Sequence, residues 1–214
     1  WPCVAILPWD VSDGDAVRLN PGIWDLVHPD EGLTAIASGG RLAVVSVEQL
    51  VDSHMSDLIV IIQVDRDWAG PAILTGDSPY LHHLNPAISS DGSRVVFQCG
   101  NDSWEGNSIC EASTDGSSFD VLLTPADGPT GGDENATLHN PDYAPDGSIV
   151  FAADWDGDRI WRLAPGSSEP TPIRGDHWWP CVLPDGGIAA VNADWSRDRE
   201  KPDLHINLLT ADGR

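Results

Sequence analysis

Short apolar runs separated by turn residues recur along the chain, and three of them share one pattern. Segments 85–97, 140–151 and 179–191 each open on a residue followed by proline, pass through an Asp-Gly pair and end in an apolar run. Asp-Gly between two extended runs favours a tight hairpin, because glycine adopts positive φ at little cost. A less regular fourth copy covers residues 33–45. The pattern therefore predicts β-hairpins repeated along the chain.

Each hairpin is followed by further short apolar runs. A third run lies at residues 108–112, 159–163 and 204–208, and a closing run follows the first two of these at 120–124 and 170–173. Four short strands per repeat, with successive copies starting 55 and 39 residues apart, are typical of a propeller blade. We expect a single all-β domain over residues 1–214, a five-bladed β-propeller of four-stranded blades. The blade-like units are 33–76, 81–125, 138–174 and 176–213, with a partial unit at 1–20, and the last unit lacks its outermost strand.

The repeat resembles that of the TolB-type β-propeller family. The resemblance rests on Asn85-Pro86 followed by Asp91-Gly92 and Phe97, on the matching segment 140–151, and on the closing pair Leu123-Thr124. It covers most of the chain and implies a propeller fold. It implies little about function, because such repeats serve many roles.

Two segments, 47–55 and 126–136, depart from the repeat. Residues 47–55 form an insertion with helical spacing, which predicts a helix of one to two turns on the rim. Residues 58–62 are apolar on both faces, as expected for a strand packed between neighbouring blades. Residues 126–136 are polar and rich in glycine, which predicts a long surface loop.

Four cysteines suggest two disulfides. Cys99 ends the second strand of its unit and Cys110 lies in the third, so the two are expected to pair across a hairpin. Cys3 and Cys181 each stand in a Trp-Pro-Cys triplet, in units that are neighbours in a closed ring, where their bond would act as a clasp. The alternative is four buried free thiols. Paired cysteines indicate an oxidising compartment, and we expect an extracytoplasmic protein that is periplasmic, cell-surface or secreted.

The charge of the chain excludes some partners. Its 34 acidic and 11 basic residues leave a net charge of −23, which repels nucleic acid and anionic lipid. No apolar run is long enough for a transmembrane helix. Cations and cationic protein surfaces are the favoured partners, and the alternative is that the charge serves solubility or adaptation to a salty or extracellular setting.

Histidines recur just before the first strand of each unit. They are His28, His82, His83, His139 and His177. If His83, His139 and His177 converge at one mouth of the central channel, they would bind a divalent metal. Some metal-dependent polysaccharide lyases resemble TolB-type propellers and carry channel histidines. The favoured alternative is that these are polar residues at strand entries, hydrogen-bonded to neighbouring blades.

Aspartates and tryptophans supply two further candidate sites. Two Asp-rich turns resemble fragments of calcium loops but lack the closing glutamate, so simple turn formation is the alternative to Ca²⁺ binding. Three of the ten tryptophans follow the second strand of their units, where they would either form an aromatic surface for protein or glycan or pack between blades. The residues concerned are Asp10, Asp13, Asp15, Asp154, Asp156 and Asp158 for calcium, and Trp104, Trp155 and Trp195 for the surface.

No recognisable catalytic motif accompanies these features. The sequence lacks a G-x-S-x-G nucleophile elbow, a P-loop and a dinucleotide fingerprint. We expect a non-catalytic protein-interaction module, or an accessory subunit of a larger cell-envelope assembly. A metal-dependent glycan lyase or hydrolase using the channel histidines is one alternative, and a lectin-like glycan binder using the tryptophans is another.

Overall fold

A computed structural model describes most of the chain beyond residue 34. The described residues are 35–36, 42–51, 54–63, 72–75, 78–101, 106–129, 133, 135–155, 157, 159–194 and 203–214. The predicted N-terminal unit at residues 1–20 lies outside them, and the fifth blade therefore stays a prediction.

The described residues form four antiparallel sheets that follow one another along the chain. Within each sheet, every strand pairs with its neighbours in sequence, as in a propeller blade. The fold class is that of an all-β propeller, as the repeat predicted. Blade one holds β1 (Ala35–Ile36), β2 (Leu42–Val51), β3 (His54–Gln63) and β4 (Ala72–Ile73); blade two holds β5 (His82–Ile88), β6 (Arg94–Gly100), β7 (Ser108–Ser113) and β8 (Phe119–Leu123); blade three holds β9 (Leu138–Tyr143), β10 (Ile149–Ala153), β11 (Arg159–Leu163) and β12 (Thr171–Gly175); blade four holds β13 (Trp178–Val182), β14 (Ile188–Asp194) and β15 (Asp203–Leu209).

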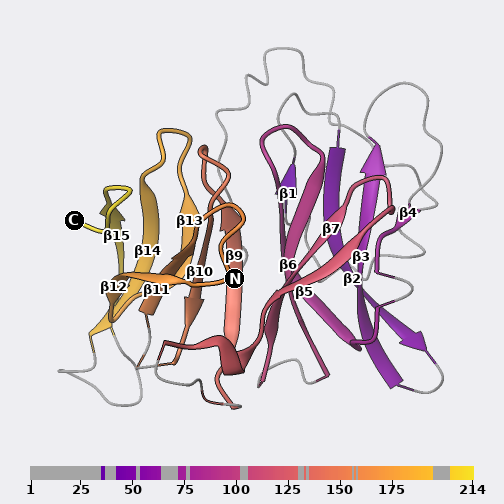
Figure 1. The fold of residues 1–214 in the computed structure, drawn as a ribbon, viewed down its shortest axis with the longest axis horizontal. Coiled ribbons are helices and arrows are strands. Elements are labelled where there is room, and N and C mark those ends of the chain that lie inside the picture. Colours follow the sequence, from indigo (N-terminus) through magenta and orange to yellow (C-terminus); the bar gives the residue numbers. More distant parts are fainter. Residues whose placement is uncertain are drawn as a thin grey trace.

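The blades contact one another mainly through the first strand of each sheet. Strand β5 contacts β1 and β9, and β9 in turn contacts β13. In Figure 1 the four sheets run from blade one on the right to blade four on the left, with β5 and β9 near the middle. The first strands are therefore the inner strands of the propeller.

Local sequence explains the turns between inner and second strands. In blade two the carboxylate of Asp91 accepts hydrogen bonds from the N–H and hydroxyl of Ser93, while Gly92 has a φ of 73°. Asp146 bonds Ser148 in the same way in blade three. An aspartate that bonds the backbone two residues on, followed by a glycine at positive φ, stabilises a tight turn.

The helix predicted over residues 47–55 is wrong. Strand β2 continues to Val51, β3 begins at His54, and the two remain paired from Leu42 opposite Gln63 to Val51 opposite His54. A helix this short gains little from its own hydrogen bonds. β-Branched residues in the segment favour a strand that extends an existing hairpin.

The segment after β8 is a surface loop that is anchored at both of its ends. It begins as a 3₁₀ turn, η1 (Pro125–Asp127), in which Asp127 accepts hydrogen bonds from the backbone N–H and the hydroxyl of Thr124. Gly128 and Ala136 are buried, whereas the described residues between them are exposed. The loop therefore lies on the surface but is anchored at both ends.

Apolar side chains fill the space between blades. One cluster joins blades two and three around Phe151 and Trp161, and a second joins blades three and four around Val150 and Ile188. A third joins blades one and two around Phe97. Burial of these faces is the main force that holds the blades side by side.

Candidate functional site

The inner strands of blades two, three and four share an irregularity at a residue-proline pair. Pairing with the second strand is interrupted at Asn85-Pro86 in β5, at Asn140-Pro141 in β9 and at Trp179-Pro180 in β13. The residue before each proline lies in the left-handed region, with φ of 51°, 50° and 48° respectively. This bulge is part of the repeat, and it gives the three residues equivalent places in adjacent blades.

Asparagine suits that conformation, whereas tryptophan does not. A short polar side chain tolerates positive φ by bonding locally, and Asn85 donates from Nδ2 to Gln98 at 3.1 Å. A bulky residue held at positive φ costs about 1–3 kcal/mol, and such strain is concentrated at functional sites. Trp179 keeps 37% of its surface exposed. Blade four therefore presents an exposed indole where the other two blades carry asparagine.

The segment that presents Trp179 is firmly held. The His177 ring hydrogen-bonds the carbonyl oxygen of Gly175 through Nδ1 at 2.7 Å and the side chain of Asn207 through Nε2 at 3.1 Å. The side chain of Asn192 donates to the carbonyl oxygen of Asp176 at 2.5 Å. Strands β14 and β15 thus fix the turn that leads into β13.

A half-buried carboxylate joins this inner strand to blade three. Asp142 of β9 accepts hydrogen bonds from the N–H of Val182 in β13 and from the N–H of Tyr143, at 2.7 and 2.8 Å. Burial raises the pKa of the Asp142 carboxyl from 3.8 to about 6, and the two hydrogen bonds oppose that shift. The charged form therefore carries a desolvation cost at neutral pH.

A second polar contact joins blades two and three beside an open pocket. The hydroxyl of Tyr143 donates to Glu111 at 2.7 Å, and Arg94 donates to the other oxygen of the same carboxylate at 3.0 Å. Burial and the neighbouring Glu111 raise the pKa of Tyr143, so its hydroxyl stays a donor. The pocket has a volume of about 400 Å³ and is lined by Ser93, Arg94, Glu111, Ser113, Thr114, Asp115, Ser118 and Asp120. Such a lining suits polar or cationic groups.

The candidate metal histidines do not share one direction. His83 and His177 each lie two residues before the positive-φ residue of the inner strand of their blade, and both are buried. His139 lies only one residue before Asn140, and alternation along a strand turns it to the other face. His82 is half-buried, and His28 lies outside the described residues.

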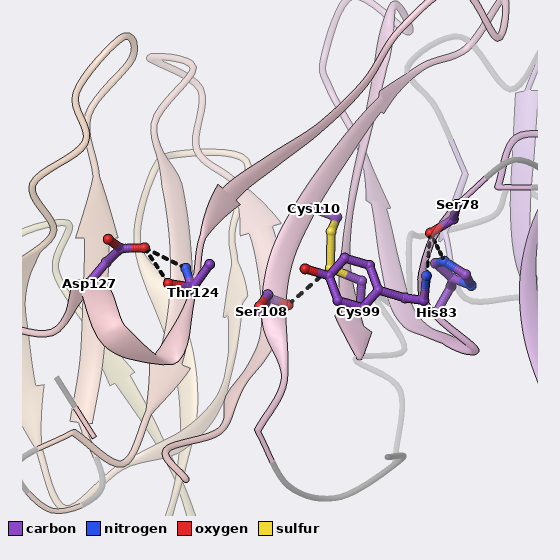
Figure 2. The surroundings of a disulfide bond; sticks show 8 residues. Ser78, His83, Cys99, Ser108, Cys110, Thr124 and Asp127 are labelled. Atoms are coloured by element: carbon purple, nitrogen blue, oxygen red, sulfur yellow. Dashed lines mark hydrogen bonds between the residues drawn. A yellow bond between two sulfur atoms is a disulfide. The ribbon is translucent and has the colours of Figure 1, made fainter. Parts of the chain in front are cut away.

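Partners within the blades account for these imidazoles. His83 hydrogen-bonds the Ser78 hydroxyl through Nε2 at 2.7 Å, as Figure 2 shows, and its ring meets that of Phe97 edge to face. His139 bonds the side chain of Asn140 at 2.8 Å. No group of three or more His, Cys, Asp or Glu able to hold a metal occurs in the described ranges. The metal site stays a prediction.

The expected hairpin disulfide is present. Cys99 of β6 and Cys110 of β7 are bonded, with Cα atoms 5.9 Å apart, and both are fully buried (Figure 2). Cys181 is also disulfide-bonded, whereas Cys3 lies outside the described residues. Free thiols are therefore the wrong alternative for the three cysteines that the structure describes.

Trp155 does not contribute to an exposed aromatic surface, contrary to that prediction. It is 8% exposed, its Nε1 donates to the carbonyl oxygen of Pro125 at 2.7 Å, and its ring packs edge to face on Phe151 and Trp161. The η1 turn covers Trp155. Trp155 therefore packs between blades, which was the alternative interpretation of this residue. The other two members of the predicted surface, Trp104 and Trp195, lie outside the described residues.

One of the calcium candidates is described. Asp154 is exposed, and its carboxylate accepts a hydrogen bond from the N–H of Thr137 at 2.7 Å. This bond ties the start of β9 to the end of β10. The remaining candidates, Asp10, Asp13, Asp15, Asp156 and Asp158, lie outside the described residues, and Ca²⁺ binding stays a prediction.

Sequence reasoning missed Trp179, although the signal was present. The aligned repeats place Asn85, Asn140 and Trp179 in one column before proline. The change from asparagine to tryptophan in that column was the available clue. The alignment does not show that the residues in this column adopt positive φ. It also does not show that the side chain at this position stays exposed in blade four.

Solved structures with the same architecture include TolB and peptidase propellers. The chain is similar to a putative TolB from Agrobacterium tumefaciens, with 21% identity, a TM-score of 0.63, and coverage of 83% of this chain and 60% of that one. It is similar to a puromycin hydrolase, with 19% identity, a TM-score of 0.61, and coverage of 81% and 28%. It is also similar to the β-propeller domain of the Trilobed protease from Pyrococcus furiosus, with 15% identity, a TM-score of 0.52, and coverage of 83% and 54%.

These likenesses show a TolB-like propeller fold. No family model matches the chain, and no curated protein matches it. The chain spans less than two thirds of the length of each of these three structures. No helix in the described part of the chain is long and apolar enough to cross a membrane.

Proposed function

We propose that this chain is a non-catalytic, extracytoplasmic β-propeller that binds a protein partner at the inner-strand rim of blade four. The observation that carries the proposal is Trp179, an exposed indole held at positive φ where the repeat elsewhere has asparagine. Tryptophan is enriched among the residues that dominate binding energy at protein interfaces. A strained and exposed aromatic residue on an inner strand is best explained by such a role.

The rigidity of the surrounding turn supports the same proposal. His177 and Asp176 are hydrogen-bonded to β14 and β15, so the indole is displayed from a fixed platform. A partner that binds a preorganised anchor pays less conformational entropy on association. The indole therefore contributes more to affinity than it would from a mobile loop.

Charge and redox chemistry support the choice of partner and compartment. A net charge of −23 favours a partner with a basic surface, because complementary charge speeds association. The buried Cys99–Cys110 bond suits an oxidising compartment such as the periplasm or the cell exterior. An accessory subunit of a cell-envelope assembly satisfies both conditions.

Affinity capture from a native extract tests the proposal. The wild-type chain is expected to capture a stoichiometric protein, and Trp179→Asn is expected to weaken that capture by at least about tenfold. The matched control is Val121→Asn, which changes a comparably exposed apolar residue on the outer strand β8 and should bind normally. Thermal unfolding checks that both variants fold.

Two results would contradict the proposal. One is the absence of any stoichiometric partner under conditions where the folded chain is stable. The other is equal capture by wild type and Trp179→Asn. A glycan array probed with the same two proteins tests the lectin alternative, because an exposed indole also stacks on sugars. Metal analysis of the purified chain tests the metal-dependent lyase alternative.

A second candidate is a supporting role beside a catalytic domain. It is favoured by the likeness to a puromycin hydrolase, of whose chain the match covers 28%. Immunoblotting of the native source with an antibody raised to this propeller tests it. A product much longer than 214 residues is expected under this candidate, and a product of only this length would exclude it.

A further inference from the structure

The polar pocket of about 400 Å³ lies on the face of blade two that turns toward blade three. Directly opposed residues of paired strands share a face, and Glu111 of β7 lies opposite both Val96 of β6 and Asp120 of β8. Val96 packs into the apolar cluster that joins the two blades. Glu111 and Asp120 therefore project from that same face, and both line the pocket.

The two carboxylates are not fully compensated by the protein. Like charges directly opposite each other on neighbouring strands destabilise a sheet. Glu111 is 9% exposed, yet its ion-pair partner Arg94 keeps 62% of its side chain in solvent. Among the described residues, no group donates a hydrogen bond to the carboxylate of Asp120 or forms an ion pair with it. A further cation in the pocket would therefore stabilise both anions.

The pocket opens where two hairpin turns of blade two meet. The backbone N–H of Thr114 in the later turn donates to the carbonyl oxygen of Ser93 in the earlier turn at 2.9 Å, which holds the two turns together. Ser93, Thr114 and Ser118 of these turns line the pocket beside Asp115. The pocket thus has one wall of hydroxyl groups, made by the turns, and one wall of carboxylates, made by β7 and β8.

The same end of the sheets is acidic in blades two, three and four. Antiparallel pairing brings the turns after the first and third strands of a blade to one end. Turns of neighbouring blades also meet there, since a Cβ at Gly186 would lie 3.9 Å from Cδ of Pro145. Hydrogen bonds from nearby serine and threonine residues lower the pKa of Asp91, Asp115 and Asp212 to about 2, so these carboxylates stay charged. The exposed aspartates of these turns, named the acidic turns below, are Asp91, Asp115, Asp146, Asp185 and Asp212.

We infer that this pocket binds a lysine or arginine side chain from a basic segment of a protein, with Glu111 and Asp120 as the carboxylates that receive it. An ammonium or guanidinium group donates several hydrogen bonds, which matches two carboxylates and the neighbouring hydroxyl groups. The acidic turns outside the pocket favour further basic residues on the same segment. A metal ion is a poorer match, because no group of three or more His, Cys, Asp or Glu able to hold one occurs in the described ranges.

Titration of the folded chain with acetylated pentalysine amide tests the binding. Asp120→Asn should weaken the affinity for this peptide by at least about tenfold, because it removes a charge that the bound cation contacts. Glu169→Gln is the matched control. Glu169 is exposed on the turn between β11 and β12, at the same end of the sheets but outside the pocket, so its loss should change the affinity by less than about twofold. No binding to the wild type, or equal losses in the two variants, would overturn the inference.

A small diamine distinguishes a free cation from a protein segment. Putrescine should bind at least about tenfold more weakly than pentalysine, because only the peptide also reaches the acidic turns. Putrescine that binds as tightly as the peptide would overturn the assignment to a protein segment. Acetylated pentaglutamine amide, which is uncharged, should not bind, and its binding would contradict recognition of a cation.

Glu111→Gln gives a second measurement on the same pocket. Glutamine keeps an acceptor for the hydroxyl of Tyr143, so the variant removes the charge while leaving that hydrogen bond possible. It should weaken peptide binding as Asp120→Asn does, and unchanged binding by a folded variant would contradict the inference. If Glu111→Gln does not unfold cooperatively on heating, the comparison of Asp120→Asn with Glu169→Gln decides alone. The titration does not involve the rim at Trp179, so its failure and the failure of the proposed function are separate results.

Discussion

At the scale of single residues, the aspartates of the repeat have opposite electrostatic roles according to their surroundings. Asp91 lies at an exposed turn, where hydrogen bonds from Ser93 and Ser89 lower the pKa of its carboxyl to about 2. Asp142 lies between two blades, where burial raises its pKa to about 6. The same side chain is therefore stabilised as an anion in one place and penalised as an anion in the other.

The first prediction concerns Asp142. Because its folded-state pKa lies above the unfolded value of 3.8, the folded state binds the extra proton between pH 6 and pH 4. The stability that this proton contributes is complete below pH 3.8 and is lost as the pH rises through 6. Relative to Asp142→Asn, the wild-type chain should gain about 3 kcal/mol of unfolding free energy over that fall in pH. Urea unfolding of both proteins at several pH values measures this difference in the free energy of unfolding.

Asp146→Asn is the matched control for Asp142. Hydrogen bonds from Ser148 lower the pKa of Asp146, so its contribution to stability is lost as the pH falls. Relative to Asp146→Asn, the wild type should therefore keep its stability between pH 6 and pH 4 and lose it only as the pH falls below about 3.8, which is the opposite sign from Asp142 and a lower pH range. Parallel pH profiles for wild type and Asp142→Asn would show that the Asp142–Val182 contact does not enclose the carboxylate as described.

At the scale of elements, the η1 turn and the end of β10 are packed without spare room. A Cβ added at Gly128 would lie 2.7 Å from Cδ1 of Trp155. The indole has little freedom to move, because it is bonded to Pro125 and packed on Phe151 and Trp161. The backbone at Gly128 has a φ of −64°, which any residue adopts. Only the contact with Trp155 opposes a larger side chain.

The second prediction follows from that contact. Gly128→Ala should lower the free energy of unfolding by about 1–3 kcal/mol, the usual cost of overpacking. Gly175→Ala is the control, because a Cβ there meets nothing within 4 Å, and it should change stability by less than about 0.5 kcal/mol. Chemical denaturation of both variants provides the comparison. Equal stability of the two variants would mean that the turn moves away from Trp155.

At the scale of the whole molecule, the excess of carboxylates opposes the compact state. The net charge is −23, and the ion pairs found in the described ranges, such as Arg94–Glu111, neutralise few of the acidic groups. Self-repulsion of this kind is long-ranged and is weakened by salt.

The third prediction is that salt stabilises the chain. Raising NaCl from about 0.01 M to about 1 M shortens the screening length from about 30 to about 3 Å, so the melting temperature should rise. The same scan at pH 4 is the control, and it should show a smaller rise because fewer carboxylates are charged. A melting temperature that falls steadily with salt would show that attractive charge pairs outweigh the repulsion.

Much of this protein was predictable from its sequence, because the determining interactions are local. The Asp-Gly turns, the order of strands within each blade and the Cys99–Cys110 pair all depend on residues close together in the chain, and alternation of apolar residues places each strand. The segment 47–55 misled because its apolar spacing fits a helix over a few residues, while pairing of β2 with β3 contributes more than that local preference.

Only the tertiary structure decided which side chains are exposed at the surface and which way they point. Trp155 and Trp179 are both tryptophans of the repeat, yet one is covered by η1 and the other is exposed on an inner strand. His83 lies three residues before the repeat proline of its strand, whereas His139 lies two residues before the proline of its own. Alternation along the strand therefore directs the two side chains to opposite faces. Burial depends on what packs from distant parts of the chain, and sequence spacing does not contain that information. The repeat determines the blades, and the contacts between blades determine the candidate site.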